Sequence, residues 1–395
     1  MSKVKFIDLG KQPIANGFLE KNEISSEFFF NLGATFDEDT NLVSLSEFVD
    51  KKLLFHDNYA YSSSMSKTMR NHFKIIANKI KKISSGKILE IGSNDGVFLF
   101  NFEPTKAISV EPCGNFSNIL NNSGYKSYTN FWNINVANEI ISNHGKMDII
   151  YAANCMCHIP EINSAFKAVS NTLSNNGIFI FEDPSLEEVI NRGSYDQIYD
   201  EHAHIFSILA LKNLLENSNL EIRLIEKLSV HGGSNRIYAT LKDNKYFPLQ
   251  KEIVNRFVEN EKVNNLSNID TFFDFSARVE LSKVNLKEML ETLKNKNKKI
   301  IGYGATSKSV VVYNYCGIDT KFIDYVTDTT PYKQGKLIPG THIPIVPPFE
   351  KGIDGSVDFA FLGAWNYEKE ILLKEKTFIK NGGNFITHVP VVRFI

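Results

Sequence analysis

The sequence predicts an α/β protein with a doubly wound parallel sheet and a second, smaller unit of the same kind. Four apolar runs, KILEIG, AISVEP, MDIIYAAN and GIFIFEDP, alternate with helix-like segments between residues 87 and 184. Such runs are typical of strands that are buried on both faces of a parallel sheet. Strands and glycine turns return in KKIIGYGATSKSVVVYNY, FIDYVTD and VDFAFLGAW. This alternation predicts α/β units in residues 71–247 and 299–395.

The remaining segments predict a small lobe and a connector. A chain of 395 residues is longer than one hydrophobic core usually serves, so several domains are expected. Residues 1–70 show no sustained helical or alternating period, which predicts a small, irregular N-terminal lobe that leans on a larger domain. Residues 248–298 carry Lys and Glu with apolar residues at helical spacing and predict a helical connector.

Composition favours a cytoplasmic protein with a small-molecule partner. Lys and Arg total 44 against 45 Asp and Glu, and the cations are scattered, which argues against nucleic acid as a partner. No stretch approaches the ~20 apolar residues of a membrane span, and the N-terminus has no signal-peptide core. Four scattered cysteines are too few for a disulfide framework or a structural zinc site, so reduced thiols and no metal are expected: Cys113, Cys155, Cys157 and Cys316.

A glycine turn follows the first predicted strand, where a doubly wound domain binds its nucleotide. Glycines let the backbone approach a ligand closely, and Glu111 ends the next strand, where a carboxylate can accept hydrogen bonds from both ribose hydroxyls. The candidate cofactor-binding residues of the turn are Glu90, Gly92, Asn94, Asp95 and Gly96.

Two cofactors are compatible with this turn. A dinucleotide requires the spacing G-x-G-x-x-G, and the middle glycine is missing here. The acidic and polar side chains of the turn suit a cation with an amino-acid tail better than a pyrophosphate. S-adenosylmethionine is therefore favoured over NAD, while a structural turn without a ligand stays possible.

Later motifs provide candidates for chemistry. Asn154 and His158 follow the strand MDIIYAA, and a helical turn there would place both on one face toward the cleft above the sheet. The segment IYDEHAHIF, residues 198–206, concentrates carboxylates and histidines, the residue types of general acid–base catalysis. HGGSNR, residues 231–236, offers His231, Ser234 and Arg236 for gripping an anionic oxygen such as that of a pyrophosphate. The alternatives are a core histidine, a solvated loop and a plain β-turn.

Taken together, the motifs resemble the sugar C-methyltransferases of deoxysugar biosynthesis, which methylate a nucleotide-linked keto-sugar with S-adenosylmethionine. The resemblance covers the chain from about Asn58 to the C-terminus and rests on EIGSNDGVFL, VEPCGNF, NCMCHIPE, IYDEHAHIFS, HGGSNRIYA, GYGATSK and DTTPYKQGKLIPGTHIPIVPP. It implies a class I (Rossmann-like) methyltransferase domain, a second Rossmann-like domain and a small N-terminal lobe. Family members typically begin with a cysteine-rich zinc module, whereas no cysteine precedes Cys113, so a metal-free or differently built lobe is expected.

The resemblance also implies roles for individual residues. The family's Tyr-x-Glu-His motif falls on Tyr199, Glu201 and His202, with His202 as general base. Asn154 and His158 would then contact the sugar. The remaining substrate-binding candidates are two tyrosines that match a family segment facing the active site and a lysine expected near a phosphate: Tyr59, Tyr61 and Lys308.

The expected chemistry is methyl transfer to a carbon beside a ketone. Carbon becomes a nucleophile only after the adjacent proton is removed, and histidine, with a near-neutral pKa, suits that task. The same base could deprotonate a hydroxyl, so O-methylation of a nucleotide-linked sugar is the alternative. An NAD-dependent oxidoreductase and a non-catalytic sugar-binding protein are further alternatives.

Overall fold

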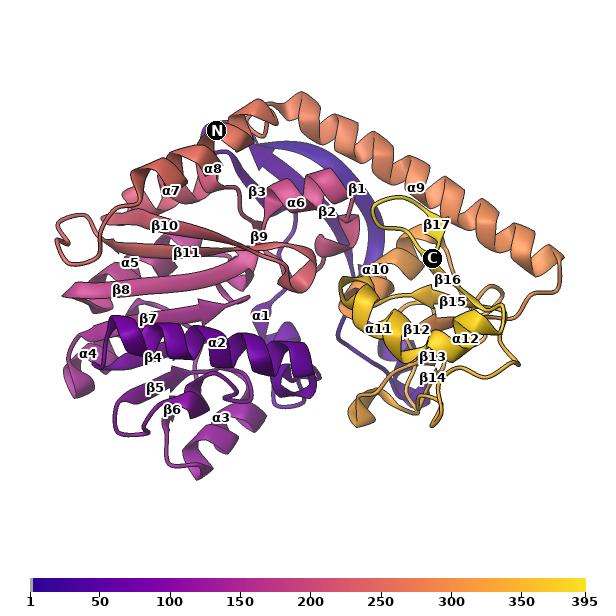
Figure 1. The fold of residues 1–395 in the computed structure, drawn as a ribbon, viewed down its shortest axis with the longest axis horizontal. Helices are drawn as coiled ribbons and strands as arrows, with labels where there is room; N and C mark the ends of the chain where they lie inside the picture. The colour runs from indigo at the N-terminus through magenta and orange to yellow at the C-terminus, as the bar shows by residue number, and fades with distance from the viewer. Residues whose placement is uncertain (1–2) are drawn as a thin grey trace.

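The computed structural model describes residues 3–395, and within that range the strands form three sheets. Figure 1 shows two α/β domains side by side, with the first strands of the chain and a long helix running between them. Within residues 3–395, the structure has no helix both long and apolar enough to cross a membrane.

The middle domain contains the predicted doubly wound sheet. Its strands lie in the order β10-β11-β8-β7-β4-β5-β6, and the last five of these are parallel. The four apolar runs form β4 (Ile88–Ile91), β5 (Ala107–Val110), β7 (Met147–Ala153) and β8 (Leu173–Pro184); the other strands are β6 (Lys126–Tyr128), β10 (Leu220–Leu228) and β11 (Ser234–Leu241). Because β5 and β7 flank β4, the strand order reverses at β4, and ligands of open α/β sheets bind at such a switch point.

Helices cover both faces of this sheet. They are α2 (Lys67–Ile83), α3 (Gly114–Asn122), α4 (Ile134–His144), α5 (Ile162–Thr172) and α7 (Ile208–Glu216). Helix α6 (Leu186–Arg192) instead buries its apolar side chains in the core shared with the N-terminal lobe. Helix α2 begins after Ser66, whose hydroxyl accepts the N–H of Met69, and it buries an apolar stripe against the sheet. Its N-terminus lies directly after the cleft-facing loop of residues 59–64, so packing of α2 holds that loop in place.

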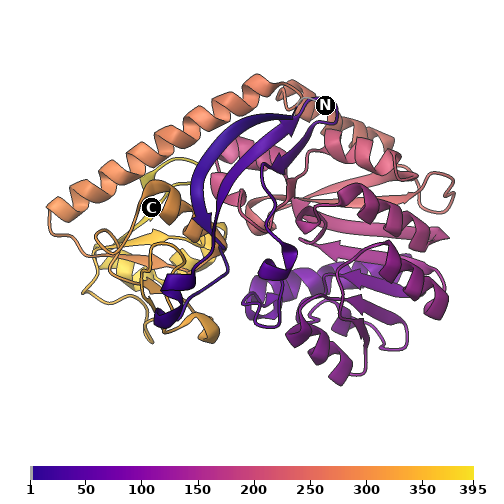
Figure 2. The same cartoon turned by 180° about the vertical axis from the view of Figure 1, so that it is seen from behind.

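The N-terminal lobe is more regular than predicted. It contains β1 (Lys3–Pro13), β2 (Phe29–Asp37) and β3 (Leu42–Leu45), and β9 (His204–Ile205) completes an antiparallel sheet with them. Irregular register between Lys5 and Ile7 and between Asp8 and Lys11 shifts the side chains between faces, so the alternation that would reveal β1 is lost. Figures 1 and 2 show β1 and β2 as long curved strands between the two α/β domains.

The lobe packs on the connector and shares a core with the C-terminal domain. The connector, residues 248–298, consists of α8 (Lys251–Val263) and α9 (Ile269–Asn295). Phe36 stacks on Phe272 of α9 with ring centroids 4.4 Å apart, and Phe6 lies 5.0 Å from the same ring. This aromatic cluster packs the lobe against α9 and the C-terminal domain.

The C-terminal domain repeats the α/β plan on a smaller scale. Its sheet has the order β14-β13-β12-β15-β16-β17, in which β17 alone, among the described strands of this sheet, pairs antiparallel. The strands are β12 (Ile300–Tyr303), β13 (Val326–Thr327), β14 (Ile345–Val346), β15 (Phe359–Leu362), β16 (Asn384–Thr387) and β17 (Arg393–Phe394), and the helices are α10 (Ser307–Cys316), α11 (Glu368–Lys374) and α12 (Lys376–Lys380). The switch point of this sheet, after β12, faces the middle domain's cleft.

Candidate active site

A cleft of about 630 Å³ lies where the three parts of the chain meet. Its walls come from the N-terminal lobe, from the carboxyl ends of β4, β5 and β7, from residues 197–202, and from the glycine turn after β12. The cleft brings together most of the residues singled out from the sequence: Tyr59, Tyr61, Glu90, Gly92, Asn94, Glu111, Asn154, His158, Tyr199, Glu201, His202, His231 and Lys308.

The turn after β4 is shaped for close approach of a ligand. Gly92 has φ +70°, and a Cβ there would lie 2.6 Å from the Cys155 sulfur, so only glycine is accommodated. Glu111 accepts the backbone N–H groups of Asn94 at 2.7 Å and of Cys113 at 2.9 Å. These two bonds fix the Glu111 carboxylate at the mouth of the turn and leave lone pairs for ribose hydroxyls.

Glu90 is the buried acidic group of the turn. It is 3% exposed, and its Oε2 atom has no hydrogen-bond partner within the described chain. Burial raises the pKa of this carboxyl well above its usual range, and the neighbouring Glu111 and Asp95 add to the effect. A buried acceptor without a partner fits a cationic ligand group, so the residues present suit the ammonium of S-adenosylmethionine.

Asp95 and Gly96 do not line the cleft. Asp95 accepts the Ser62 hydroxyl and the Ser64 N–H, the latter at 2.9 Å, and thereby ties the loop of residues 59–64 to the turn. Gly96 has φ +79°, and a Cβ there would lie 2.7 Å from a side-chain carbon of Leu120. In this structure both residues shape the turn and make no contact with the cleft.

Tyr59 and Glu201 meet across the cleft. The Tyr59 hydroxyl donates to Glu201 at 2.9 Å, and the Asn16 amide donates to the other carboxylate oxygen at 2.7 Å. Burial raises the pKa of Glu201 to about 7, although these two hydrogen bonds and the nearby Lys308 oppose the rise. Glu201 is therefore a carboxyl group whose charge changes near neutral pH.

His202 is held in one tautomer. Its Nδ1 lies 2.7 Å from the Gln197 carbonyl oxygen, which can only accept a hydrogen bond, so Nδ1 carries the proton and Nε2 is an acceptor. Burial lowers the pKa of His202 well below its usual range, with contributions from His158 and Lys308. The imidazole is therefore neutral at physiological pH and has a free lone pair, while Tyr199 packs on it at a centroid distance of 4.2 Å.

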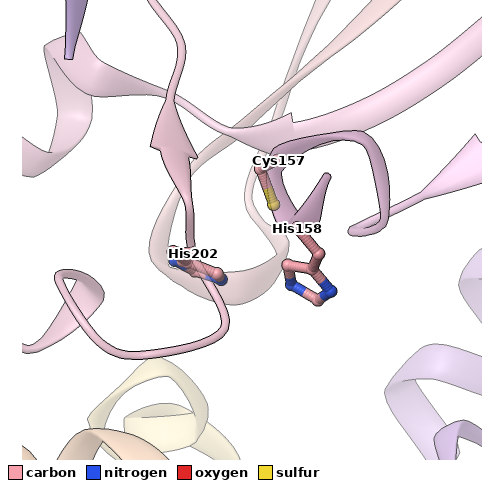
Figure 3. A group of neighbouring side chains, drawn as sticks. All are labelled: Cys157, His158 and His202. Carbon is pink, nitrogen blue, oxygen red and sulfur yellow. The ribbon is translucent and has the colours of Figure 1, made fainter. Parts of the chain in front are cut away.

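Asn154 and His158 both line the cleft, but a regular α-helical turn does not place them there. Asn154 has φ +50° and donates its N–H to the Glu182 carbonyl oxygen at 2.6 Å; the following 3-10 turn covers Met156–His158. The His158 ring lies 5.4 Å from the ring of His202 and 5.4 Å from that of Phe55. Figure 3 shows the two histidines beside Cys157. Burial lowers the pKa of His158 to about 4, so this ring is also neutral.

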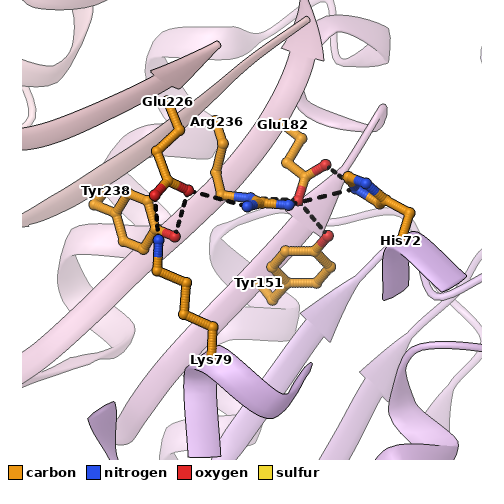
Figure 4. Close-up of polar contacts among 7 residues, drawn as sticks. All are labelled: His72, Lys79, Tyr151, Glu182, Glu226, Arg236 and Tyr238. Carbon is orange, nitrogen blue, oxygen red and sulfur yellow. Dashed lines mark hydrogen bonds and ion pairs between the residues drawn. The ribbon is translucent and has the colours of Figure 1, made fainter. Parts of the chain in front are cut away.

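Of the segment HGGSNR, His231 reaches the cleft and the other two candidates do not. His231 has φ +53° and burial lowers its pKa to about 3. The Ser234 hydroxyl donates to the Val230 carbonyl oxygen at 3.2 Å. Arg236 points into the middle domain, where Figure 4 shows it between two carboxylates: its guanidinium bonds Glu182 at 2.8 Å and Glu226 at 3.0 Å.

The network around Arg236 is buried and nearly complete. His72 lies 2.6 Å from Glu182, and Tyr151 donates to the same carboxylate at 2.8 Å. Lys79 and Tyr238 bond Glu226. Nε and Nη1 of Arg236 are thus directed at protein carboxylates and Nη2 lies 3.5 Å from the ring nitrogen Nε2 of His72, which leaves a ligand phosphate no access to the guanidinium.

The C-terminal domain contributes buried cations that sequence reasoning only partly anticipated. Lys308, at the start of α10, and Lys333 both line the cleft and are less than a tenth exposed. Burial lowers the pKa of each. Lys333 donates to the Ala305 carbonyl oxygen at 2.7 Å, and Asp328 accepts the Ala305 N–H at 2.8 Å.

Asn16, Gln197 and Lys333 are cleft residues that the sequence did not reveal. Asn16 lies in the N-terminal lobe, for which no regular structure was predicted. Lys333 ends the 3-10 turn Pro331–Lys333 within the motif DTTPYKQGKLIPGTHIPIVPP, but the resemblance gave this lysine no role of its own. Gln197 directly precedes the IYDEH segment, but its function uses a backbone carbonyl, which no residue type can signal.

Comparison with known proteins covers the whole chain. A methyltransferase domain family matches residues 65–225 and the family of C-methyltransferase C-terminal domains matches residues 229–390. A zinc binding domain family matches residues 1–55. The N-terminal module is therefore retained, and the expectation of a differently built lobe is corrected, although residues 1–55 contain no cysteine.

Individual proteins agree with these matches. The chain is 30% identical to the C-methyltransferase NovU of Streptomyces niveus, over 98% of this chain and 93% of that protein. A SAM-dependent methyltransferase of Anabaena variabilis (13% identity, 49% of this chain, 91% of that chain) and one of Thermotoga maritima (18%, 44%, 92%) give TM-scores of 0.39 and 0.34, a likeness too low to bear on activity. On the near full-length identity and the family matches, the chain belongs to the C-methyltransferases that use S-adenosylmethionine.

Proposed function

We infer that this enzyme methylates a carbon of a nucleotide-linked sugar beside a ketone, with His202 as the general base. The observation that carries the proposal is the fixed tautomer of His202. Its Nδ1–H is held by the Gln197 carbonyl at 2.7 Å, so Nε2 is the atom able to accept a proton in the cleft.

The first chemical step is removal of the proton from the carbon beside the ketone. Nε2 of His202 takes this proton, and the electron pair of the C–H bond forms an enolate whose charge resides on the ketone oxygen. Burial disfavours the imidazolium that results, and the neighbouring Glu201 carboxylate offsets that cost when ionised. Donors along the cleft, including Asn154 and Tyr199, are placed to stabilise the oxygen.

The cofactor's contribution is electrophilic: S-adenosylmethionine, when bound, supplies a methyl group activated by the sulfonium. The chain's own contribution is alignment. Glu111 would hold the ribose, Glu90 would face the cationic amino-acid part, and the walls from three domains would orient the sugar carbon toward the methyl group.

Buried cations support a nucleotide-linked substrate. Lys308 and Lys333 face the cleft from the C-terminal domain, whereas the cofactor-binding turn belongs to the middle domain. A diphosphate linker is the sugar-nucleotide group that buried ammonium groups and the N-terminus of α10 would bind. His231, across the same cleft, adds a neutral donor or acceptor.

The proposal is tested by mass spectrometry of reactions in deuterated water. Purified protein is incubated with S-adenosylmethionine and a panel of nucleotide sugars, each in keto and reduced form. Gain of one methyl group by a keto-sugar, with deuterium entering the carbon beside the ketone in the sugar that is not yet methylated, is the expected result. Methylation of a reduced sugar without such exchange would mean O-methylation and would overturn the proposal.

A further inference from the structure

Cys157, His158 and His202 surround a common space beside the catalytic base. Within residues 3–395 they are the one group of three Cys, His, Asp or Glu residues whose ligand atoms lie close enough to hold a metal ion, all within 4.8 Å of one another. Figure 3 shows the Cys157 sulfur directed between the two rings. Cys157 takes no part in the proposed proton transfer, so the proposed function does not explain why a thiol lies beside these two histidines.

The distances require only a small adjustment to bind one ion. For any three atoms at most 4.8 Å apart, a point can be found within about 2.8 Å of each, whereas zinc binds nitrogen at about 2.0 Å and sulfur at about 2.3 Å. Each side chain would therefore move by well under about 1 Å, which small χ rotations supply.

Both histidines are prepared for such a role. The Gln197 carbonyl holds Nδ1–H of His202, the arrangement that orients most metal-binding histidines and leaves Nε2 as the ligand. The Nε2 atom of His158 is buried and has no hydrogen-bond partner within the described part of the chain. A buried, unpartnered ring nitrogen beside a thiol indicates a missing ligand.

The ligand set selects the kind of ion. One thiolate and two imidazoles favour zinc, cobalt or copper, whereas magnesium and calcium prefer oxygen ligands. Three protein ligands leave a fourth position, which here opens into the cleft, since His158 and His202 line it. The site differs from a structural zinc module, whose four ligands close the coordination sphere.

The geometry points to an inhibitory binding site for a thiophilic divalent metal ion of the zinc class on Cys157, His158 and His202. The ion takes the Nε2 lone pair of His202, and the Cys157 thiol releases its proton to solvent as its sulfur binds. While the ion is bound, no base is available for the substrate's carbon-bound proton. Inhibition rests on the proposed role of His202; binding of the ion does not.

Cobalt binding tests the site without turnover. Protein freed of metal with a chelator is titrated with Co²⁺ while the thiolate-to-cobalt charge-transfer absorption is recorded. Wild type and Cys316→Ala, which removes a buried thiol elsewhere, should develop the band and saturate at one ion per chain. Cys157→Ala should show none. An equal band in Cys157→Ala, or no band in wild type, would overturn the proposal.

Zinc inhibition tests the consequence. Zn²⁺ should inhibit methyl transfer by the wild type reversibly on chelation, and Cys157→Ala, with ordinary basal turnover, should need at least about tenfold more Zn²⁺, because even second-sphere losses cost metal sites that much affinity. A cobalt band without zinc inhibition would disprove the inhibitory role and count against His202 as base. Absence of the band in the wild type, with methyl transfer intact, would disprove the metal site and leave the proposed role of His202 untouched.

Discussion

The indole N–H of Trp365 donates a hydrogen bond of 2.6 Å to Asp196, and this bond joins the C-terminal domain to the segment that precedes His202. Asp196 is fully buried, and His388 lies 3.4 Å from the same carboxylate oxygen. The next residue, Gln197, holds His202 in its tautomer. Trp365 also packs on Gly232, where a Cβ would lie 2.4 Å from the indole. The Trp365 side chain thus supports both the segment that holds His202 and the turn that contains His231.

Trp365→Phe should therefore lower kcat about tenfold or more while leaving the affinity for S-adenosylmethionine unchanged. The variant removes the donor to a buried carboxylate, a loss that costs about 1–3 kcal/mol, and it loosens the backbone that orients His202. Steady-state kinetics and a calorimetric cofactor titration measure the two effects. Tyr315→Phe, which removes an exposed donor to Glu280 on the same domain, is the control and should behave as wild type. Equal kcat in both variants would refute the coupling.

Glu201 should control the pH dependence of turnover. Its pKa of about 7, raised by burial, means that the carboxylate is ionised above pH 7 and protonated below. The ionised form offsets the charge gained by His202, so kcat should rise with pH through about 7. Glu201→Gln cannot ionise and should give a lower kcat without this rise. A pH profile in Glu201→Gln that keeps the wild-type inflection would assign the titration to another group.

Glu111→Ala should weaken binding of S-adenosylmethionine. The N–H groups of Asn94 and Cys113 fix the Glu111 carboxylate, and the variant lacks the hydrogen bonds proposed between this carboxylate and the ribose. Hydrogen bonds to a charged group are worth about 1.5–3 kcal/mol, or roughly 10- to 100-fold in affinity. Isothermal titration with the cofactor measures the change. Glu201→Gln, across the cleft, should retain cofactor affinity and serves as the comparison. An unchanged dissociation constant for S-adenosylmethionine in Glu111→Ala would contradict the proposed contact between Glu111 and the ribose.

Arg236→Met should lower the free energy of unfolding of the middle domain and leave substrate binding unchanged. The variant leaves buried Glu182 without its permanently charged partner, and breaking a buried ion pair typically costs about 3–5 kcal/mol. Arg192→Met removes a half-exposed pair with Glu188 and should cost no more than about 1 kcal/mol. Urea unfolding followed by circular dichroism compares them. If Arg236→Met instead has a raised KM for the nucleotide sugar and wild-type stability, Arg236 contacts the phosphate as the sequence predicted.

The parallel strands were predictable because each is buried on both faces and therefore reads as an apolar run. The N-terminal sheet was not, because the irregular register near Lys5 and Asp8 breaks the alternation of β1. β9 contributes only His204 and Ile205, too short a stretch to show a period.

The site shows a similar division. Glu90, Glu111 and His158, from motifs at strand ends, line one cleft because carboxyl ends of neighbouring parallel strands converge; His202 lines the same cleft from the segment before β9. Arg236 was misplaced since a guanidinium suited to a phosphate is equally suited to a buried carboxylate. Counting cysteines gave no indication of a metal site, because the grouping of Cys157 with His202 depends on tertiary structure and cannot be read from spacing.

Proton exchange by His202 is the most direct test of the account. Wild type and His202→Asn are each incubated in deuterated water with a nucleotide keto-sugar that the enzyme methylates and with S-adenosylhomocysteine, so that no methyl group is transferred. NMR then follows deuterium entering the carbon beside the ketone. The account predicts exchange by the wild type and its loss in His202→Asn, with cofactor affinity retained. Exchange at the wild-type rate in His202→Asn would contradict it.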